Sequence, residues 1–223
     1  MKMEHYRRRG QIFLASGVAL LLLFTLWTML IQSVDVQCVG VNGTEVGFAG
    51  LNTWVHSLTG VNMTLYNITD WLGLVPVFLC MGFGLLGFGQ LIKRKSLLKV
   101  DRDIVLLGVY YVIVIFGYLI FEMIPINYRP ILINGFMEAS YPSSTTLLVV
   151  SVMPTLIFQL GLRVKNVKIK WIVGTVVICF SAFMVVGRLI SGVHWVTDIV
   201  GSLLLSGGLY YSYKGIALIS FKR

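Results

Sequence analysis

The stretch Gly187-Arg188-Leu189-Ile190-Ser191-Gly192-Val193-His194-Trp195-Val196-Thr197-Asp198 joins two long apolar runs and carries three ionisable side chains. Ionisable groups are costly at membrane depth, so they are functional candidates there. His194 and Asp198 are four residues apart, which in a helix places both on one face, where the carboxylate can hold one imidazole nitrogen and direct the other. Arg188 adds a permanent, fork-shaped cation suited to phosphate or carboxylate. The alternative is a charged residue near a helix end and an interfacial histidine.

The composition is that of a membrane protein. Of the 223 residues, 57% are apolar and 12% are charged, whereas soluble domains have about 25% charged residues. Several apolar runs have roughly the 18 to 22 residues that a bilayer core demands. We expect an all-α polytopic membrane protein, a single domain over residues 1–223 with six transmembrane helices. The expected spans are approximately 11–32, 71–92, 104–121, 146–162 and 171–190, with a sixth that ends near residue 213.

The distribution of positive charge predicts the topology. The net charge is +9, and 16 of the 18 Lys and Arg residues lie in four groups at the ends of apolar runs. We therefore exclude nucleic-acid binding. With six spans all four groups fall on one side, which the positive-inside rule makes cytoplasmic, together with both termini. The two remaining cations, Arg129 and Arg188, fall on the outer side, where topology does not need them. This asymmetry predicts an outward-facing site.

The first outer segment, residues 33–70, is polar and has no Lys or Arg. Within it, apolar residues recur with helical spacing at Phe48, Leu51, Trp54, Val55 and Leu58. This pattern predicts a short amphipathic helix on the membrane surface. The basic residues before the first apolar run resemble the start of a signal peptide, but the run is too long for one. We expect a retained first span and location in a cell membrane, most consistent with a bacterial plasma membrane.

The second outer segment contains Pro142 followed by Ser143, Ser144 and Thr145, just before an apolar run. This pattern predicts a helix N-terminus, whose unpaired backbone N–H groups and positive dipole end can bind an anion. The alternative is an ordinary helix cap. If the two arginines, this N-terminus and the His–Asp pair converge, they form a phosphate pocket beside a nucleophilic or basic imidazole. The cysteines and the single nearby histidine suggest no metal site.

The chain resembles the type-2 phosphatidic acid phosphatase superfamily, membrane lipid phosphatases that share a helical core with vanadium haloperoxidases. The third motif of that family is Ser-Arg-x5-His-x3-Asp. It is matched here by Arg188, His194 and Asp198, with Gly187 in place of the serine. The order of the motifs, their outward location and the six-span layout also agree with the family.

The first two motifs of the family are matched only in part. The first, Lys-x6-Arg-Pro, is matched by Arg129-Pro130, with Glu122 at the lysine position. The second, Pro-Ser-Gly-His, is matched by Pro142-Ser143, with Ser144 and Thr145 in place of the glycine and the histidine. The family's histidine at this position is its general acid, so Thr145 removes the group that protonates the departing oxygen.

The resemblance implies a role for each matched residue. His194 would attack phosphorus and form a phosphohistidine that water hydrolyses, and Asp198 would orient His194. The residues implied to hold the phosphoryl oxygens are Arg129, Arg188, Ser143 and Ser144. The family needs neither a metal nor another cofactor. The implied substrate is a phosphorylated membrane lipid in the outer leaflet.

The replacement at Thr145 leaves three possibilities, because general acid catalysis contributes about 10²–10⁴-fold. The protein is a weak or inactive relative that binds or transports phosphorylated lipid. Alternatively, another residue serves as the acid, and the candidates are Glu138, Glu122 and Tyr141. Thirdly, the substrate has a good leaving group, as in an isoprenoid diphosphate such as undecaprenyl diphosphate. We expect an enzyme, a metal-independent lipid phosphatase; a binding protein is the alternative, and a small transporter or structural protein with an accidental resemblance is the least favoured.

Overall fold

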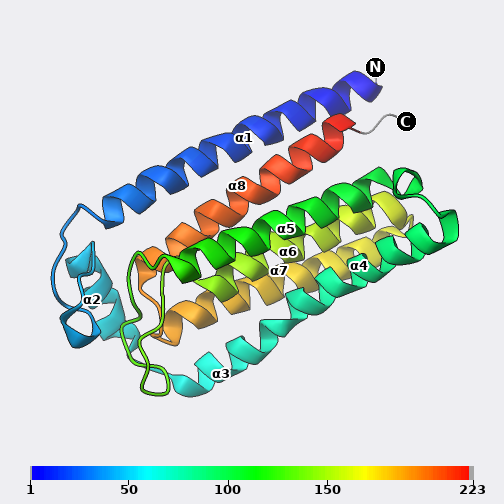
Figure 1. Ribbon diagram of the computed structural model, residues 1–223. Helices are drawn as coiled ribbons and strands as arrows, with labels where there is room; N and C mark the ends of the chain where they lie inside the picture. Colours follow the sequence, from blue (N-terminus) through cyan, green and yellow to red (C-terminus); the bar gives the residue numbers. More distant parts are fainter. Residues whose placement is uncertain (1, 221–223) are drawn as a thin grey trace.

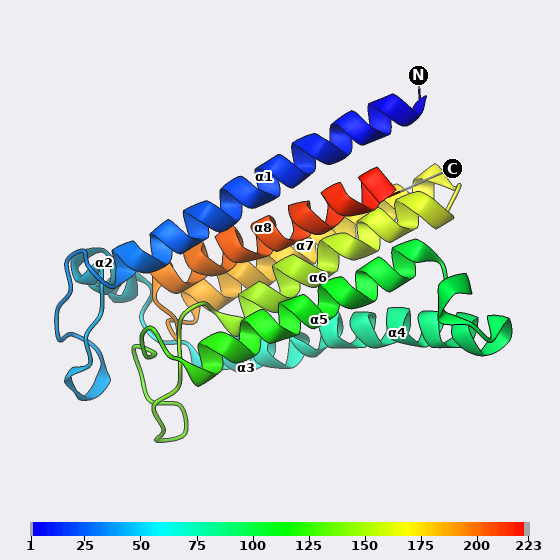
Figure 2. The ribbon, with the colours of Figure 1, turned by 45° about the horizontal axis from the view of Figure 1, so that its top comes forward.

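The computed structural model describes residues 2–220, and its regular elements are all helical (Figure 1). The helices are α1 (Lys2–Ile31), α2 (Ala49–Thr59), α3 (Met63–Leu72), α4 (Leu74–Arg94), α5 (Arg102–Met123), α6 (Ser144–Arg163), α7 (Val167–Ile190) and α8 (Val196–Ser220), with 3-10 turns at Val41–Gly43 and Leu97–Lys99. This confirms the predicted all-α fold. The long helices lie side by side in a bundle, and α2, α3 and residues 124–143 lie at one end of it (Figures 1 and 2).

Within the described residues, five segments are long and apolar enough to cross a membrane. They are Glu4–Ile31, Met63–Arg94, Arg102–Met123, Ser144–Arg163 and Val167–Ile190. These helices make the protein a multi-pass membrane protein. Helix α8 is not among the five, although it has 25 residues and runs along α1 inside the bundle (Figure 1). Its crossing, and hence the sixth span, remains a prediction.

Helix α8 is covered by several neighbours. It contacts α1, α2, α5, α6 and α7, and it buries serines and glycines such as Ser202, Ser206 and Gly208. A Cβ added at Gly17 of α1 would lie 2.4 Å from Oγ of Ser212. Small residues let helices approach this closely inside membranes. A helix enclosed by protein does not need the continuous apolar surface of one that faces lipid.

The second predicted span is longer than expected and is bent. Its helical part begins at Met63 as α3, and Gly73 separates α3 from α4. The side chain of Asn62 caps α3 by accepting a hydrogen bond from the N–H of Leu65. Helix α3 packs against α7 at Gly187. The approach is close, since a Cβ added at Gly187 would lie 2.8 Å from Cγ2 of Thr69. Gly187, which stands in place of the serine of the third motif, therefore lets α3 approach the site.

The helix predicted in the first outer segment is α2. One face of it packs on α8 through Asn52, which is fully buried and donates to the carbonyl oxygen of Gly47 and to the hydroxyl of Thr197. The other face exposes apolar side chains, namely Leu51, Trp54 and Leu58. The structure thus confirms the helix and its two faces. Its position on a membrane surface stays a prediction.

The basic turns lie at the end of the bundle opposite α2. Figure 1 shows the beginning of α1, the end of α8 and the connections α4–α5 and α6–α7 at this end. Two ion pairs stabilise the connections: Arg94 with Asp101 at 2.7 Å, and Arg163 with Asp103. The last two basic residues, Lys222 and Arg223, lie outside the described residues. The arrangement agrees with the predicted grouping of positive charge on one side.

Candidate active site

The third motif spans the connection from α7 to α8. His194 does not lie on a helix, because the chain turns at Gly192, which has a φ of +67°. A Cβ at Gly192 would lie 1.8 Å from the carbonyl oxygen of Gly60, so only glycine fits this turn. Asp198 lies in the first turn of α8. The pair is still close, with Nδ1 of His194 3.7 Å from Oδ2 of Asp198.

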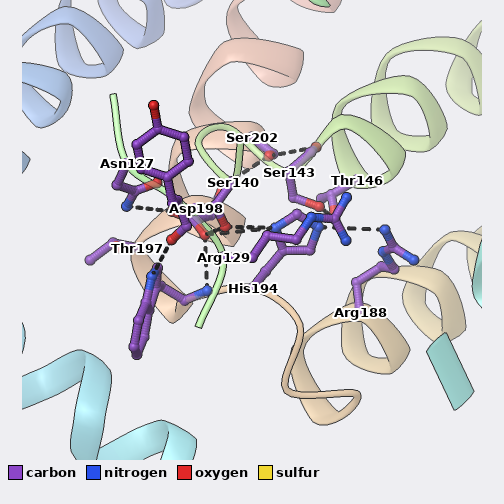
Figure 3. A network of polar contacts seen from close by, with 12 residues as sticks. Asn127, Arg129, Ser140, Ser143, Thr146, Arg188, His194, Thr197, Asp198 and Ser202 are labelled. Carbon is purple, nitrogen blue, oxygen red and sulfur yellow. Dashed lines mark hydrogen bonds and ion pairs between the residues drawn. The ribbon is translucent and has the colours of Figure 1, made fainter. Parts of the chain in front are cut away.

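A serine completes the connection between this histidine and this carboxylate (Figure 3). The Oγ of Ser140 lies 3.1 Å from Nδ1 of His194, and its hydroxyl donates a hydrogen bond to Oδ2 of Asp198. Because that hydroxyl proton is directed to the carboxylate, Nδ1 of His194 is the donor in the other contact. The imidazole is therefore protonated at Nδ1, and its Nε2 is unprotonated and carries the lone pair.

The carboxylate of Asp198 is fully buried and held by two further donors. Nδ2 of Asn127 donates to Oδ1 at 3.1 Å, and the backbone N–H of Trp195 donates to Oδ2 at 2.9 Å. Together with Ser140, these donors stabilise a charge that burial alone would disfavour. They also fix the orientation of the group that orients His194.

Arg188 lies on the Nε2 side of the imidazole and is 1% exposed. Its Nη2 is 3.4 Å from Nε2 of His194. An arginine can only donate hydrogen bonds, so Nε2 is the acceptor here, which agrees with the tautomer that Ser140 imposes. Its Nη1 lies 3.5 Å from Oδ1 of Asp70 and 3.5 Å from Oγ1 of Thr69. The Nε of Arg188 is buried and has no partner within residues 2–220.

Arg129 enters the same site from residues 124–143 and is 8% exposed. Its Nη2 pairs with Oε2 of Glu138 at 3.1 Å. Its Nε and Nη1 are buried without a hydrogen-bond partner in the described part of the chain. The ring of Tyr66 lies over both arginines, with its centroid 4.9 Å from Cζ of Arg188 and 5.7 Å from Cζ of Arg129. Buried unpartnered N–H groups are costly, and an anion between the arginines would satisfy them.

The protonation state of His194 follows from this environment. Its pKa is held well below 6.5, first because burial disfavours the charged imidazolium and then because Arg129 and Arg188 repel it. The imidazole is therefore neutral at neutral pH. A neutral imidazole with an unprotonated Nε2 next to two cations is suited to attack an electrophile that carries negative charge.

The N-terminus of α6 forms another wall of the site. Ser143 is its N-cap residue, and the Ser143 hydroxyl donates to Oγ1 of Thr146 and does not cap the helix. The first N–H groups of a helix lack intrahelical partners, so they are free to meet an anion. The hydroxyl of Ser202 on α8 fixes this helix end by donating to the carbonyl oxygen of Ser143 at 2.9 Å.

The candidate acids are dispersed. The Tyr141 hydroxyl lies 2.7 Å from Oγ1 of Thr28 on α1, and burial raises the pKa of Tyr141. Glu138 pairs with Arg129. Glu122 is exposed at the end of α5 beside a small cavity that Tyr118 and Phe121 also line. The structure thus brings Glu138 to the rim of the site but does not bring the Tyr141 hydroxyl or Glu122 to the imidazole.

The sequence analysis missed several residues of the site. Ser140 and Asn127 reach Asp198 from the loop between α5 and α6, and nothing in their local sequence marks them. Asp70 reaches Arg188 from α3. Its signal was present, because it is an acidic residue in an outer segment that has no cation to pair with it. Within residues 2–220, no three side chains of His, Cys, Asp and Glu are grouped as a metal site would need.

An apolar cavity of about 470 Å³ opens beside this site. Asp70, Ser144 and Thr145 line its polar end, and the remainder is lined mainly by apolar side chains of α4, α5 and α6. Val77 of α4 and Val114 of α5 are among these side chains. A ligand with an anionic head and an apolar tail could therefore occupy both the site and the cavity.

Comparisons with known proteins agree with this geometry. Residues 104–217 match the family model of the PAP2 superfamily. The chain matches no curated protein sequence. Among solved structures, it is similar to one described as the crystal structure of the first transmembrane PAP2 type phosphatidylglycerolphosphate phosphatase, from Bacillus subtilis. The TM-score is 0.63 and the identity 18%, over 91% of this chain and 96% of that chain, which indicates a shared fold. The motif resemblance is confirmed, and this chain belongs to the PAP2 superfamily.

Proposed function

We propose that this protein is an integral-membrane lipid phosphate phosphatase that works through a phosphohistidine. One observation carries the proposal: two buried arginines with unpaired N–H groups lie beside a neutral histidine, and one of them, Arg188, contacts the unprotonated Nε2. Guanidinium groups bind phosphoryl oxygens bidentately and stabilise the charge that develops in the transition state. Family membership supports a phosphatase at the general level.

In the proposed reaction, Nε2 of His194 attacks phosphorus while Arg129 and Arg188 hold the phosphoryl oxygens. The N–P bond forms as the bond to the leaving oxygen breaks, and the imidazolium that results is stabilised through Ser140 and Asp198. Water then attacks phosphorus, and the electron pair of the N–P bond returns to Nε2. The free N–H groups of α6, near Ser143 and Ser144, add hydrogen bonds to the phosphate. No step needs a metal ion.

The cavity beside the site supports a lipid as the substrate. Its apolar walls lie between membrane-spanning helices, and its polar end meets the arginines through Asp70. A lipid that diffuses in the bilayer could place its phosphate in the site and one of its chains in the cavity. We infer a phosphorylated membrane lipid as the substrate class. Phosphatidylglycerophosphate, which the similar Bacillus subtilis protein is described as using, is the first candidate.

We also infer that the site faces the outer leaflet and that both termini are cytoplasmic. The supporting observation is that the site lies at the end of the bundle opposite the basic turns (Figure 1). Positive charge marks the cytoplasmic side of membrane proteins. This inference includes α8 as the sixth span. A bacterial plasma membrane is the proposed location.

A second candidate function follows from Thr145, which replaces the family's general-acid histidine at the polar end of the cavity. Without an acid, the protein either binds phosphorylated lipid without hydrolysing it or acts on a lipid diphosphate, whose leaving group needs little protonation. In the second case a polyprenyl diphosphate would react far faster than a phosphate monoester.

The deciding experiment measures phosphate release by the purified protein from phosphatidylglycerophosphate, phosphatidic acid and a polyprenyl diphosphate, each in mixed micelles. The His194→Ala variant is the matched control. The proposal expects release by the wild type and none above background by the variant. Release retained in the variant would exclude His194 as the nucleophile. Binding of all three lipids without release by the wild type would establish the binding function instead.

A further inference from the structure

We propose that Asp70 is the catalytic acid that passes a proton to the departing oxygen. This role rests on the proposed phosphatase function and deepens it, because it makes phosphate monoesters good substrates. The observation is a juxtaposition: Asp70 and His194 lie at the two ends of one guanidinium group. Nη2 of Arg188 is 3.4 Å from Nε2 of His194, and Nη1 of Arg188 is 3.5 Å from Oδ1 of Asp70.

This arrangement fits the geometry of phosphoryl transfer. The attacking atom and the leaving oxygen lie roughly in line through phosphorus. A phosphoryl group held against Arg188 therefore has the nucleophile on the side of Nη2 and its leaving oxygen on the side of Nη1. Asp70 is the carboxyl group on that second side. It also lines the polar end of the apolar cavity, where the lipid part of the leaving group would lie.

The chain carries a specific change that brings Asp70 to this point. Gly187 lacks the side chain that the family's motif has at this position, and Thr69 of α3 fills that space, as the 2.8 Å approach of its Cγ2 demonstrates. The next residue is Asp70, and Tyr66, one turn earlier, lies over Arg188. The loss of one side chain on α7 and the gain of a carboxylate from α3 are therefore parts of the same packing arrangement.

Asp70 also lies beside the position where the family has its acid. The Cβ position of Gly73, one turn after Asp70, is 3.4 Å from Cγ2 of Thr145. Both Asp70 and Thr145 line the same cavity. Asp70 is half-exposed, with 56% of its side chain accessible, so it can exchange protons with water. The other candidate acids lack this combination, since neither Glu138 nor Tyr141 lines this cavity and the Tyr141 hydroxyl contacts Thr28.

The proton balance of the reaction is complete. In the substrate complex of this proposed reaction, the Asp70 carboxyl carries a proton. As the N–P bond forms, the P–O bond breaks, its electron pair stays on the departing oxygen, and the proton of Asp70 moves to that oxygen. In the second half, the Asp70 carboxylate accepts a proton from the attacking water. The N–P bond then breaks, and Asp70 is left protonated, ready to release the proton to solvent with the product.

The test compares two monoesters that differ in their leaving group. Phosphatidic acid releases an alkoxide that needs protonation, whereas p-nitrophenyl phosphate releases a stable phenolate that does not. We expect Asp70→Asn to lower kcat for phosphatidic acid by about 10²–10⁴-fold, the usual contribution of a general acid. Its kcat for p-nitrophenyl phosphate should stay within about threefold of wild type. Glu45→Gln, which removes an exposed outer carboxylate away from the site, should change neither rate.

A second variant tests for rescue. Asp70→Asn combined with Thr145→His restores an acid from α6. Its kcat for phosphatidic acid should therefore be at least about tenfold higher than that of Asp70→Asn alone. Equal losses on both substrates in Asp70→Asn would overturn the acid role and indicate that Asp70 only supports Arg188. Unchanged activity on phosphatidic acid, or a selective loss in Glu122→Gln instead, would also overturn it. The His194→Ala variant must lose both activities; if it does not, the proposed function itself fails.

Discussion

The hydroxyl oxygen of Ser140 lies 3.1 Å from Nδ1 of His194, closer to that nitrogen than the carboxylate of Asp198, which is 3.7 Å away. The serine therefore joins the two ends of the pair that the third motif supplies. It sets the imidazole tautomer, because its own proton is directed to Asp198. A loop residue outside the matched motif positions thus determines which nitrogen of His194 is the nucleophile.

The first prediction concerns this serine. Ser140→Ala should remove a hydrogen bond to a charged network, a loss of about 1.5 to 3 kcal/mol, which corresponds to about a ten- to hundredfold decrease in kcat. KM should change little, because Ser140 contacts the far side of the imidazole from the arginines. Steady-state kinetics on the lipid substrate provide the measurement. Ser151→Ala, which also removes a buried serine hydroxyl, is the matched control and should retain activity. A rise in KM alone would contradict the positioning role.

The second prediction concerns pH. The pKa of His194 is held well below 6.5, so the nucleophile stays neutral. Protonation of His194 should therefore not lower kcat/KM until the pH is well under 6.5. The same shift affects stability. The unfolded chain binds a proton at its ordinary pKa and the folded chain does not, so the stability contributed by neutral His194 is complete above pH 6.5 and lost as the pH falls below it.

Thermal unfolding in detergent measures this effect. Between about pH 7 and about pH 5, the range in which an ordinary histidine titrates, the wild type should lose more stability than His194→Gln. The comparison removes the contribution of other titrating groups, since both proteins share them. Equal losses in the two proteins would mean that His194 has the same pKa in the folded and the unfolded chain, which would contradict the prediction.

The third prediction concerns the phosphate-binding arginines. Arg129→Lys keeps the charge but removes the fork whose Nε and Nη1 are buried and unpartnered. Loss of one such donor typically costs about 10²–10³ in kcat, and KM should also rise because the ground state contacts the same group. Arg94→Lys, in an ion pair at the opposite end, is the control. Wild-type kinetics in Arg129→Lys would show that point charge alone is sufficient.

The part of the site that sequence predicts is the part encoded by local spacing. Arg188, His194 and Asp198 lie within eleven residues, so their proximity follows from one connection. Ser140 could not be predicted, because it meets His194 only when residues 124–143 fold over the end of α7. Asp70 required the packing of α3 on Gly187, in which a missing side chain on one helix admits another helix. Such contacts depend on how helices that are distant in the sequence pack together, and the periodicity of one segment does not show this.

The helices of the fold also differ in how well the sequence predicts them. Lipid-facing helices such as α4 and α5 carry long apolar runs and were predicted to within a few residues at one or both ends. Helix α3 was missed because its ten residues resemble a polar surface segment. Helix α8 was predicted by position, yet it is not among the five segments that are apolar enough to cross a membrane, and it carries buried polar residues such as Asp198 and Ser202. A helix enclosed by its neighbours can carry such polar residues, because it does not have to face lipid on every side.

The fourth prediction concerns the attachment of α2. Asn52 is fully buried and bonded to Gly47 and Thr197, so Asn52→Ala leaves the carbonyl oxygen of Gly47 and the hydroxyl of Thr197 without this partner. An unsatisfied buried group costs about 1 to 3 kcal/mol. The variant should unfold at a lower temperature and expose α2 to protease before the helical bundle is cleaved. Asn67→Ala, which removes an exposed asparagine of the neighbouring α3, should behave as wild type. Unchanged protection of α2 would mean that its packing does not depend on Asn52.

The fifth prediction tests whether the cavity holds the lipid chain. Val77 lines the cavity, whereas Val75, on the same helix, does not line it, and both side chains are 38% exposed. Val77→Trp should fill part of the 470 Å³ volume and raise KM for a long-chain lipid phosphate, because the chain then loses apolar contact area that contributes about 25 cal/mol per Å². The same variant should keep its KM for p-nitrophenyl phosphate, which has no chain. Val75→Trp should leave both values unchanged. If the two tryptophan variants behave alike, the chain binds elsewhere, and the cavity is not the path by which a lipid reaches His194.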